Sequence, residues 1–231
     1  SGGYYVCRNI VFVKITLTNK LSGLYCNAET MLQQLCKGIS MKKKIKDFAS
    51  VQMGYSFRSR LESVEAGDVS VIQMKDLLDN NTVSCNDLLR IDMDSVKEHH
   101  LVRKGDLVFR SRGQVTTTAI VLEDPGKAIV AAPLLRIRVS MLEVLPEYLN
   151  WYISQSDAQI FLTSRAGGTA QKMIGKETIE DMEIPLPTLE KQKHIIELAS
   201  LVAKEKELLQ TIAEKRGQFI TAILMQVAKG E

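Results

Sequence analysis

Residues 186–196 read LPTLEKQKHII, and this stretch decides how the rest of the chain is organised. Pro187 ends the element before it, because proline restricts the residue that precedes it. Thr188 is a residue type favoured at helix N-caps, while Lys191 occupies the position where a capping box has Glu. No proline follows. The stretch therefore predicts one helix from Glu190 to Val227, roughly 57 Å long at about 1.5 Å per residue.

The predicted helix carries an apolar seam. Alternate steps of three and four from Ile195 meet apolar side chains at seven of ten positions, and the other three are Glu205, Arg216 and Gln226. This pattern is typical of a coiled coil. Either the helix folds back on its own domain, or it packs on another long helix. We expect the second, as an antiparallel homodimer, because the helix is longer than a small domain. The expected dimerisation residues are Ile195, Leu198, Val202, Leu209, Ile212, Phe219 and Ile223.

The whole-chain composition limits the class of protein. The chain has 231 residues, of which 45% are hydrophobic, enough for one globular domain and an extension. No apolar run approaches the roughly 18 residues of a membrane span, so we expect no membrane contact. The four Cys and three His show no ligand or disulfide spacing. We therefore expect no metal, no cofactor and a cytoplasmic location.

The segment before Met41 differs in character from the rest of the chain. Ser1-Gly2-Gly3 looks like a cloning scar, and Met41 followed by three Lys looks like a natural protein start. We expect residues 1–40 to be an N-terminal extension, residues 41–188 a globular domain and residues 189–231 a long helical region. Within the extension, Ile10–Leu17 predicts a strand and Asn27–Leu35 a short helix.

The globular domain is predicted to mix strands and short helices. The expected strands are Val69–Met74, one within Val102–Gly113 between a turn and a basic loop, Thr116–Leu122 and Ala128–Val139, with the last three in a β-meander. The expected helices are Ile45–Ala49, Pro146–Ser156, a second one ending at Thr163, and Glu177–Met182. Residues 76–94 are acidic and predict a loop. The predicted fold class is α+β, a mixed α/β globular domain followed by a long coiled-coil-type helix.

Charge alternates along the domain. Residues 41–60 hold six basic side chains and one acidic, and residues 101–138 hold seven basic and three acidic. The segments after each of them are acidic. This pattern allows one basic face without a strongly basic protein, which suits a polyanion. On charge alone, an ordinary solvated surface is an equal alternative.

Three segments carry candidate contacts to a nucleic acid. Residues 52–60 interleave two aromatics with two arginines, which can stack on bases and reach phosphates or base edges. An equal alternative places both rings in the core and both arginines in solvent. Arg110 and Arg112 are two apart, so in an extended chain they point the same way. Residues 165–175 are Gly-rich, which allows close approach of the backbone to another molecule.

The candidate DNA-binding residues are Tyr55, Phe57, Arg58, Arg60, Arg110, Arg112, Gln114, Thr169, Gln171 and Lys172. We expect five of them to lie on one concave surface. These are Arg58, Arg60, Arg110, Arg112 and Lys172.

Four stretches follow one another in a recognisable order. They are MGYSFR at 53–58, KGDLVFRSRG at 104–113, GTAQKMI at 168–174 and IPLPTLEKQ at 184–192. The last is the most specific, because a Pro-rich strand end opens a long helix. Through these stretches, residues 41–231 resemble the specificity subunit of Type I restriction–modification systems.

The resemblance implies a function and an architecture. Subunits of that family have two target-recognition domains, each followed by a long helix, and each domain reads half of a split site in double-stranded DNA. The antiparallel helices set the spacing and dock methyltransferase and restriction subunits. By this resemblance, residues 41–188 are a DNA target-recognition domain. The chain then resembles a half-subunit that pairs with a second copy.

The sequence lacks the motifs of the catalytic subunits, as expected for a non-catalytic subunit. The sequence holds neither an Asn/Asp-Pro-Pro-Tyr motif for base methylation nor a GxGxxG after a strand, so we expect no catalytic residues. Two other functions stay open. One is an autonomous nucleic-acid enzyme that uses residues such as Asp106 and Glu123, and the other is a coiled-coil scaffold without DNA binding.

Overall fold

The chain divides into two compact units, Ser1–Ile39 and Ser40–Glu231. The computed structural model describes residues 5–7, 10–12, 41–58, 61–113, 116–167 and 173–230. In the first unit, β1 (Tyr5–Cys7) pairs antiparallel with β2 (Ile10–Phe12). The strand predicted at Ile10–Leu17 is therefore described only at its start. The helix predicted at Asn27–Leu35 lies outside the described residues.

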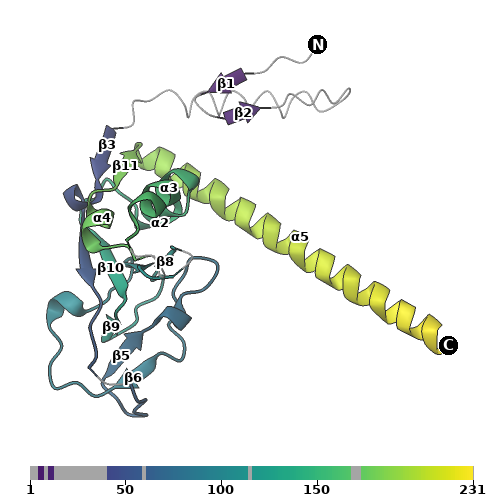
Figure 1. The fold of residues 1–231 in the computed structure, drawn as a ribbon, viewed down its shortest axis with the longest axis horizontal. Helices are drawn as coiled ribbons and strands as arrows, with labels where there is room; N and C mark the ends of the chain where they lie inside the picture. The colour runs from purple at the N-terminus through teal and green to yellow at the C-terminus, as the bar shows by residue number, and fades with distance from the viewer. Residues whose placement is uncertain are drawn as a thin grey trace. The chain divides into compact units, whose positions relative to one another are not determined.

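The second unit contains a four-stranded antiparallel sheet in the order β4-β10-β7-β8 (Figure 1). Its strands are β4 (Ala49–Met53), β10 (Leu134–Val139), β7 (Leu107–Arg110) and β8 (Thr118–Ile120). Leu107 and Phe109 of β7 belong to the largest hydrophobic cluster, while Val108 between them belongs to a second cluster. Side chains alternate along a strand, so the first three residues of β7 are covered on both faces, and all three are apolar.

A second, three-stranded sheet has the order β6-β5-β9. Its strands are β6 (Leu89–Ile91), β5 (Val69–Ile72) and β9 (Ala128–Val130). The central strand β5 runs antiparallel to β6 and parallel to β9. In Figure 1 these strands gather at one end of the domain, away from the helices α2 and α3.

Three sequence predictions about the strands are wrong. Ala128–Val139 is not one strand: β9 and β10 belong to different sheets and are separated by a turn at the cis Ala132–Pro133 bond. Pro133 has no N–H to donate to a ladder, which favours a break there. The predicted β-meander does not form either, because β9 pairs with β5. Residues 76–94, predicted as a loop, include β6.

Short helices cover one face of the four-stranded sheet. They are α2 (Pro146–Ile153), α3 (Ser156–Arg165), α4 (Lys176–Glu180) and the 3-10 turn η1 (Ile45–Asp47), all of which contribute to the largest hydrophobic cluster. Two other 3-10 turns are η2 (Met74–Asp76), whose Met74 packs against the second cluster, and η3 (Glu98–His100). Leu149 and Ile153 of α2 are fully buried in the largest cluster together with Leu135 of β10. The helices predicted near residues 146–163 and 177–182 are confirmed.

A two-stranded ribbon joins the first and last strands of the domain. β3 (Met41–Lys44) pairs antiparallel with β11 (Glu183–Leu186). The strand β3 was not predicted from the sequence, because three of its four residues are lysines. The Asp181 carboxylate lies 3.1 Å from Lys44 Nζ and 2.9 Å from Lys46 Nζ. The ribbon thereby anchors the strand that leads into the long C-terminal helix.

That helix, α5, runs without interruption over Leu189–Lys229 (Figure 1). The Thr188 side chain caps it by accepting a long hydrogen bond from Lys191 N at 3.5 Å. Every described residue from 201 to 230 is exposed within this chain. The predictions of an α+β fold and of a long C-terminal helix are confirmed. None of the helices in the described part of the chain is long and apolar enough to cross a membrane.

Gln192 joins α5 to the domain. It is fully buried in the first turns of a helix that is otherwise mostly exposed. Its side-chain oxygen accepts from Leu145 N at 2.9 Å, and its amide donates to Glu143 O at 2.8 Å and Pro187 O at 2.9 Å. The Glu-x-Gln of the fourth stretch therefore has a structural reason, since its Gln holds the loop before α2 against the helix.

We expect Gln192→Ala to lower the free energy of unfolding of the domain by about 1–3 kcal/mol. The reason is that the backbone N–H of Leu145 and the backbone carbonyl of Glu143 lose the fully buried side chain that is their hydrogen-bond partner. Urea denaturation measures the effect. The matched control is Gln210→Ala in the exposed part of the same helix, expected within about 0.5 kcal/mol of wild type. Equal losses in both variants would contradict the role given to Gln192.

Candidate nucleic-acid interface

The first of the four stretches packs directly against residues 131–133, the link between β9 and β10, and against the strand ends beside it. Gly54 N donates to Leu134 O at 2.9 Å, and Tyr55 N donates to Val130 O at 2.7 Å. Ala132 N donates in return to Tyr55 O at 2.9 Å. A Cβ on Gly54 would meet the Ala131 carbonyl carbon at 2.7 Å. Only glycine permits this approach of two backbones, which explains the Gly in the first stretch.

The two aromatic rings of this stretch are half-buried. The Tyr55 and Phe57 ring centroids are 4.8 Å apart, and both rings pack against the cluster that contains Val71 and Ile129. Arg58, one residue further, is exposed. Most of the surface of both rings therefore packs against the core, as the alternative interpretation of this segment expected. Phe57 also lines a hollow, so part of this ring remains available to a ligand.

The hollow beside Phe57 has a volume of about 410 Å³. Its other lining residues come from the first stretch, from Leu61 shortly after it, from η2 and the residue before it, and from residues 131–133 between β9 and β10. They are Ser56, Leu61, Gln73, Met74, Ala131, Ala132 and Pro133. Arg110 reaches this region from β7, because its Nη2 donates to Met74 O at 3.2 Å.

The two arginines of the second stretch have different surroundings. Arg110 is half-buried, and its Nε is buried without a hydrogen-bond partner among the described residues. Arg112 is exposed. Ser111 between them is buried, and its hydroxyl donates to Pro133 O. Of the two, Arg112 is the side chain with no hydrogen bond or ion pair to another described residue, so within the described part of the chain it can contact another molecule without breaking one.

Gly167, just before the third stretch, and Met173 within it are hydrogen-bonded to each other, next to Arg112 of the second stretch. Gly167 N donates to Met173 O at 3.1 Å, and Met173 N donates to Gly167 O at 2.9 Å. Met173 also pairs with Arg112, and Ile174 N donates to Ser111 O at 2.8 Å. The two residues that flank 168–172 in the sequence are therefore held together, with Met173 next to Arg112.

The structure therefore brings together segments that are far apart in the sequence. Segment 54–58 lies against 130–134, which contacts Ser111, and Ser111 contacts Ile174. The remaining candidates, Arg60, Gln114, Thr169, Gln171 and Lys172, lie outside the described residues. One concave surface for the basic side chains stays a prediction.

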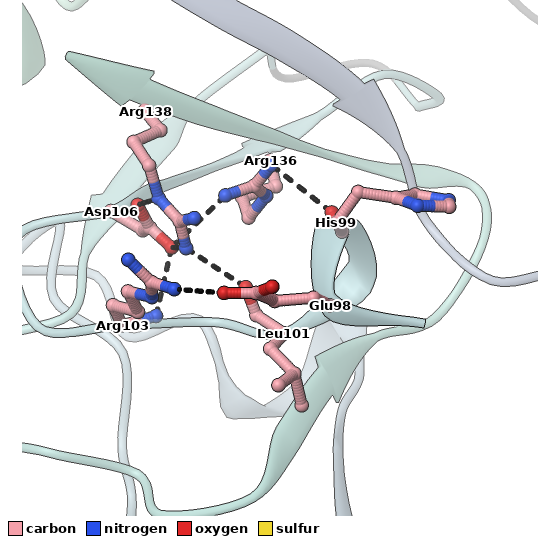
Figure 2. Close-up of polar contacts among 7 residues, drawn as sticks. All are labelled: Glu98, His99, Leu101, Arg103, Asp106, Arg136 and Arg138. Atoms are coloured by element: carbon pink, nitrogen blue, oxygen red, sulfur yellow. Dashed lines mark hydrogen bonds and ion pairs between the residues drawn. The ribbon is translucent and has the colours of Figure 1, made fainter. Parts of the chain in front are cut away.

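Behind these segments lies a buried cluster of charges (Figure 2). Asp106 of the Lys-Gly-Asp turn is 2% exposed, and its two carboxylate oxygens accept from Arg138 Nε at 2.7 Å and Nη2 at 2.6 Å. Asp106 also accepts from Arg103 N at 2.8 Å, and it lies 3.6 Å from Arg136 Nη1. Burial lowers the pKa of the Arg136 guanidinium, and Asp106 opposes that effect.

The two arginines extend from this carboxylate to η3. Arg136 Nη2 donates to His99 O at 3.2 Å, and Arg138 Nη2 donates to Leu101 O at 2.8 Å (Figure 2). On the other side of η3, the His100 ring lies edge-on to Tyr55 with centroids 5.5 Å apart. Burial lowers the pKa of His100, as do the nearby His99, Lys97 and Arg136. The cluster thus supports the segment that backs Tyr55.

Asp106 and Glu123 carry the alternative of an autonomous enzyme, and their surroundings do not favour it. The Asp106 carboxylate is buried and occupied by a guanidinium and a backbone amide. Glu123 is exposed in the turn after β8. Sequence reasoning missed the partners Arg136 and Arg138, because their distance from Asp106 along the chain gives no local signal.

Comparisons with known proteins agree with this architecture. A family model described as Type I restriction modification DNA specificity domain matches residues 40–215. The Type I restriction enzyme MjaIX specificity subunit of Methanocaldococcus jannaschii is 26% identical over 181 residues, which are 74% of this chain and 41% of that protein.

Two solved structures share the fold. The HsdS subunit from Thermoanaerobacter tengcongensis has a TM-score of 0.56 and 17% identity, over 80% of this chain and 45% of that one. A chain solved in work on complex assembly and conformational transition of the type I R-M system has a TM-score of 0.57 and 16% identity, over 81% and 47%. This chain thus spans less than half the length of these relatives. Because the family model covers most of it, the chain belongs to the family of Type I restriction modification DNA specificity domains.

Proposed function

We propose that the chain is a sequence-specific DNA-binding subunit of a Type I restriction–modification system. It reads one half of a bipartite site and docks methyltransferase and restriction subunits, without catalysis of its own. The observation that carries the proposal is the convergence of the first three motif stretches around Ser111 and the link between β9 and β10. Exposed Arg58 and Arg112 border this region, and arginine suits phosphates and base edges.

The domain boundaries belong to the same proposal. Residues 41–188 act as the target-recognition domain and residues 189–231 as the spacer and dimerisation region, while residues 1–40 are an extension with no part in recognition. Support comes from Gln192, which joins the domain to a helix that is exposed from residue 201 onward.

We further propose a homodimer formed through α5. Large apolar side chains of its seam are exposed within the chain, among them Leu209 at 60% and Phe219 at 67%. Leaving such a side chain in water forfeits roughly 1.5–3 kcal/mol relative to full burial. Two copies paired through this seam carry two recognition domains, one for each half of the DNA site.

We expect Arg112→Ala to weaken binding to all duplexes alike by about 1–2 kcal/mol, or roughly 5- to 30-fold. Arg112 is exposed and pairs with Met173 at the base of the third stretch, a position suited to a phosphate contact. Titrations at several salt concentrations should give a slope of log K against log [salt] that is smaller by about one.

The matched control is Arg90→Ala, which removes an exposed arginine from β6, outside the three converging segments. It should leave affinity and salt slope unchanged. Wild-type affinity in the Arg112 variant would remove this residue from the interface. A chain with no salt-dependent duplex binding would instead favour the coiled-coil scaffold.

A further inference from the structure

The seam of α5 contains two charges that lack partners along their own helix. On a helix, side chains three and four positions apart are neighbours. Around Glu205 these neighbours are Leu201, Val202, Leu208 and Leu209. Around Arg216 they are Ile212, Ala213, Phe219 and Ile220. Neither charge forms an ion pair within the part of the chain that the structure describes.

Burying the seam therefore places each charge among apolar side chains. A buried charge is costly unless an opposite charge meets it. Since no intrahelical neighbour can do so, the opposite charge has to come from across the interface. The helix itself carries one acidic and one basic residue in the seam, so a second copy of the same chain can supply both partners.

The direction of pairing decides whether these charges meet. In a parallel pair, Glu205 faces Glu205 and Arg216 faces Arg216, so like charges oppose each other twice. In an antiparallel pair with its two-fold axis between Leu209 and Ile212, Glu205 of each copy faces Arg216 of the other. We propose that α5 pairs with α5 of a second copy in this antiparallel register, fixed by two reciprocal Glu205–Arg216 ion pairs. The inference rests on the dimer of the proposed function and defines its geometry.

Most of the remaining seam residues fit the same register, although Ile195, which packs against the core of its own domain, faces Gln226. Leu209 faces Ile212, Val202 faces Phe219, and Leu198 faces Ile223 of the second copy. Sliding one helix by a heptad keeps an apolar seam but misplaces the charges. Glu205 then faces Leu209 or Ile223, and Arg216 faces Leu198 or Ile212. The two charges thus select one register among those that the apolar residues alone would allow.

This register also sets the separation of the two domains. The end of one helix, Lys229, lies beside Gln192 of the other, where α5 joins its domain. The two joints are then about 56 Å apart along the helices at about 1.5 Å per residue.

Charge reversal tests the ion pairs. Glu205→Arg or Arg216→Glu alone brings like charges together twice, and sedimentation should show a dimer dissociation constant raised at least about tenfold. An equimolar mixture of the two variants should form a heterodimer of near wild-type affinity, because opposite charges meet again. The double variant E205R/R216E should likewise recover the homodimer. Single variants that dimerise like wild type would overturn the proposal.

Disulfide trapping tests the direction and register. In a background with Cys7, Cys26, Cys36 and Cys85 replaced by Ser, Val202→Cys and Phe219→Cys chains should cross-link on oxidation only when mixed. Cross-linking of the Val202→Cys chain with itself would show a parallel pair and overturn the register while leaving the dimer intact. A wild-type chain that stays monomeric at tens of micromolar would instead refute the dimer of the proposed function, whatever its DNA binding.

Discussion

Changing both Leu209 and Ile212 to Asp should convert the proposed dimer into monomers. In the proposed register these residues face each other across the two-fold axis, so the change removes four large apolar side chains per dimer. If each is fully buried, this forfeits roughly 6–12 kcal/mol, at about 1.5–3 kcal/mol per side chain. A loss of about 6 kcal/mol already weakens association about 10⁴-fold. Sedimentation velocity measures the state of association, and tight DNA binding should be lost with it.

The domain itself should remain folded in this variant. Leu209 is 60% and Ile212 49% exposed within the single chain, so neither contributes to the domain core. The matched control changes the adjacent Gln210 and Thr211 to Asp, which adds the same charges on another face of the helix. The control should stay dimeric. A dimeric L209D/I212D variant would contradict pairing through the seam.

Asp106→Ala should cause the largest loss of domain stability, about 3–5 kcal/mol. Breaking a buried ion pair by removing one partner leaves the other charge uncompensated. Here it strands Arg136, whose side chain is 6% exposed, and Arg138, whose side chain is 25% exposed. The Arg103 amide of the same turn also loses its acceptor. Urea denaturation followed by circular dichroism gives the free energy of unfolding.

The matched control is Asp68→Ala. Asp68 pairs with Lys127, and both side chains are 46% exposed, so solvent screens the pair. Exposed ion pairs contribute about 0–1 kcal/mol. A loss in the Asp106 variant no larger than in the Asp68 variant would show that the cluster in Figure 2 does not hold the fold.

How far sequence reasoning succeeded depends on whether the signal is local. The helix α5 was predicted to within about two residues at each end, because its cap at Thr188, its seam and the absence of Pro all lie in one continuous stretch. The short helices near Pro146 and Glu177 were found for the same reason. Each of these patterns repeats every few residues along the chain.

The errors arise where partners are distant along the chain. The division of Ala128–Val139 into β9 and β10 depends on β5 and β4, which supply the separate sheets. The lysine-rich β3 forms because β11 pairs with it. Gln192 belongs to the fourth stretch, but the sequence assigned it no role, and it is fully buried against the loop at Glu143–Leu145.

The candidate site follows the same rule. The first three stretches were correctly singled out as belonging together, because the structure joins them through contacts of Ser111, Pro133 and Met173. The sequence could not separate Arg112, which is exposed, from Arg110, which is bound to Met74 O. That difference depends on η2, which lies 36 residues earlier in the chain.

The most direct test of the proposed function is selection of bound DNA from a library of random duplexes by the purified chain, with the recovered duplexes then sequenced. The proposal predicts two identical half-sites in inverted orientation, separated by an unread spacer. A separation of about 56 Å between the helix joints places the half-sites at most about 17 base pairs apart, at about 3.4 Å per base pair. Recovered duplexes that share no sequence, although they bind the protein, would contradict sequence-specific recognition by this chain.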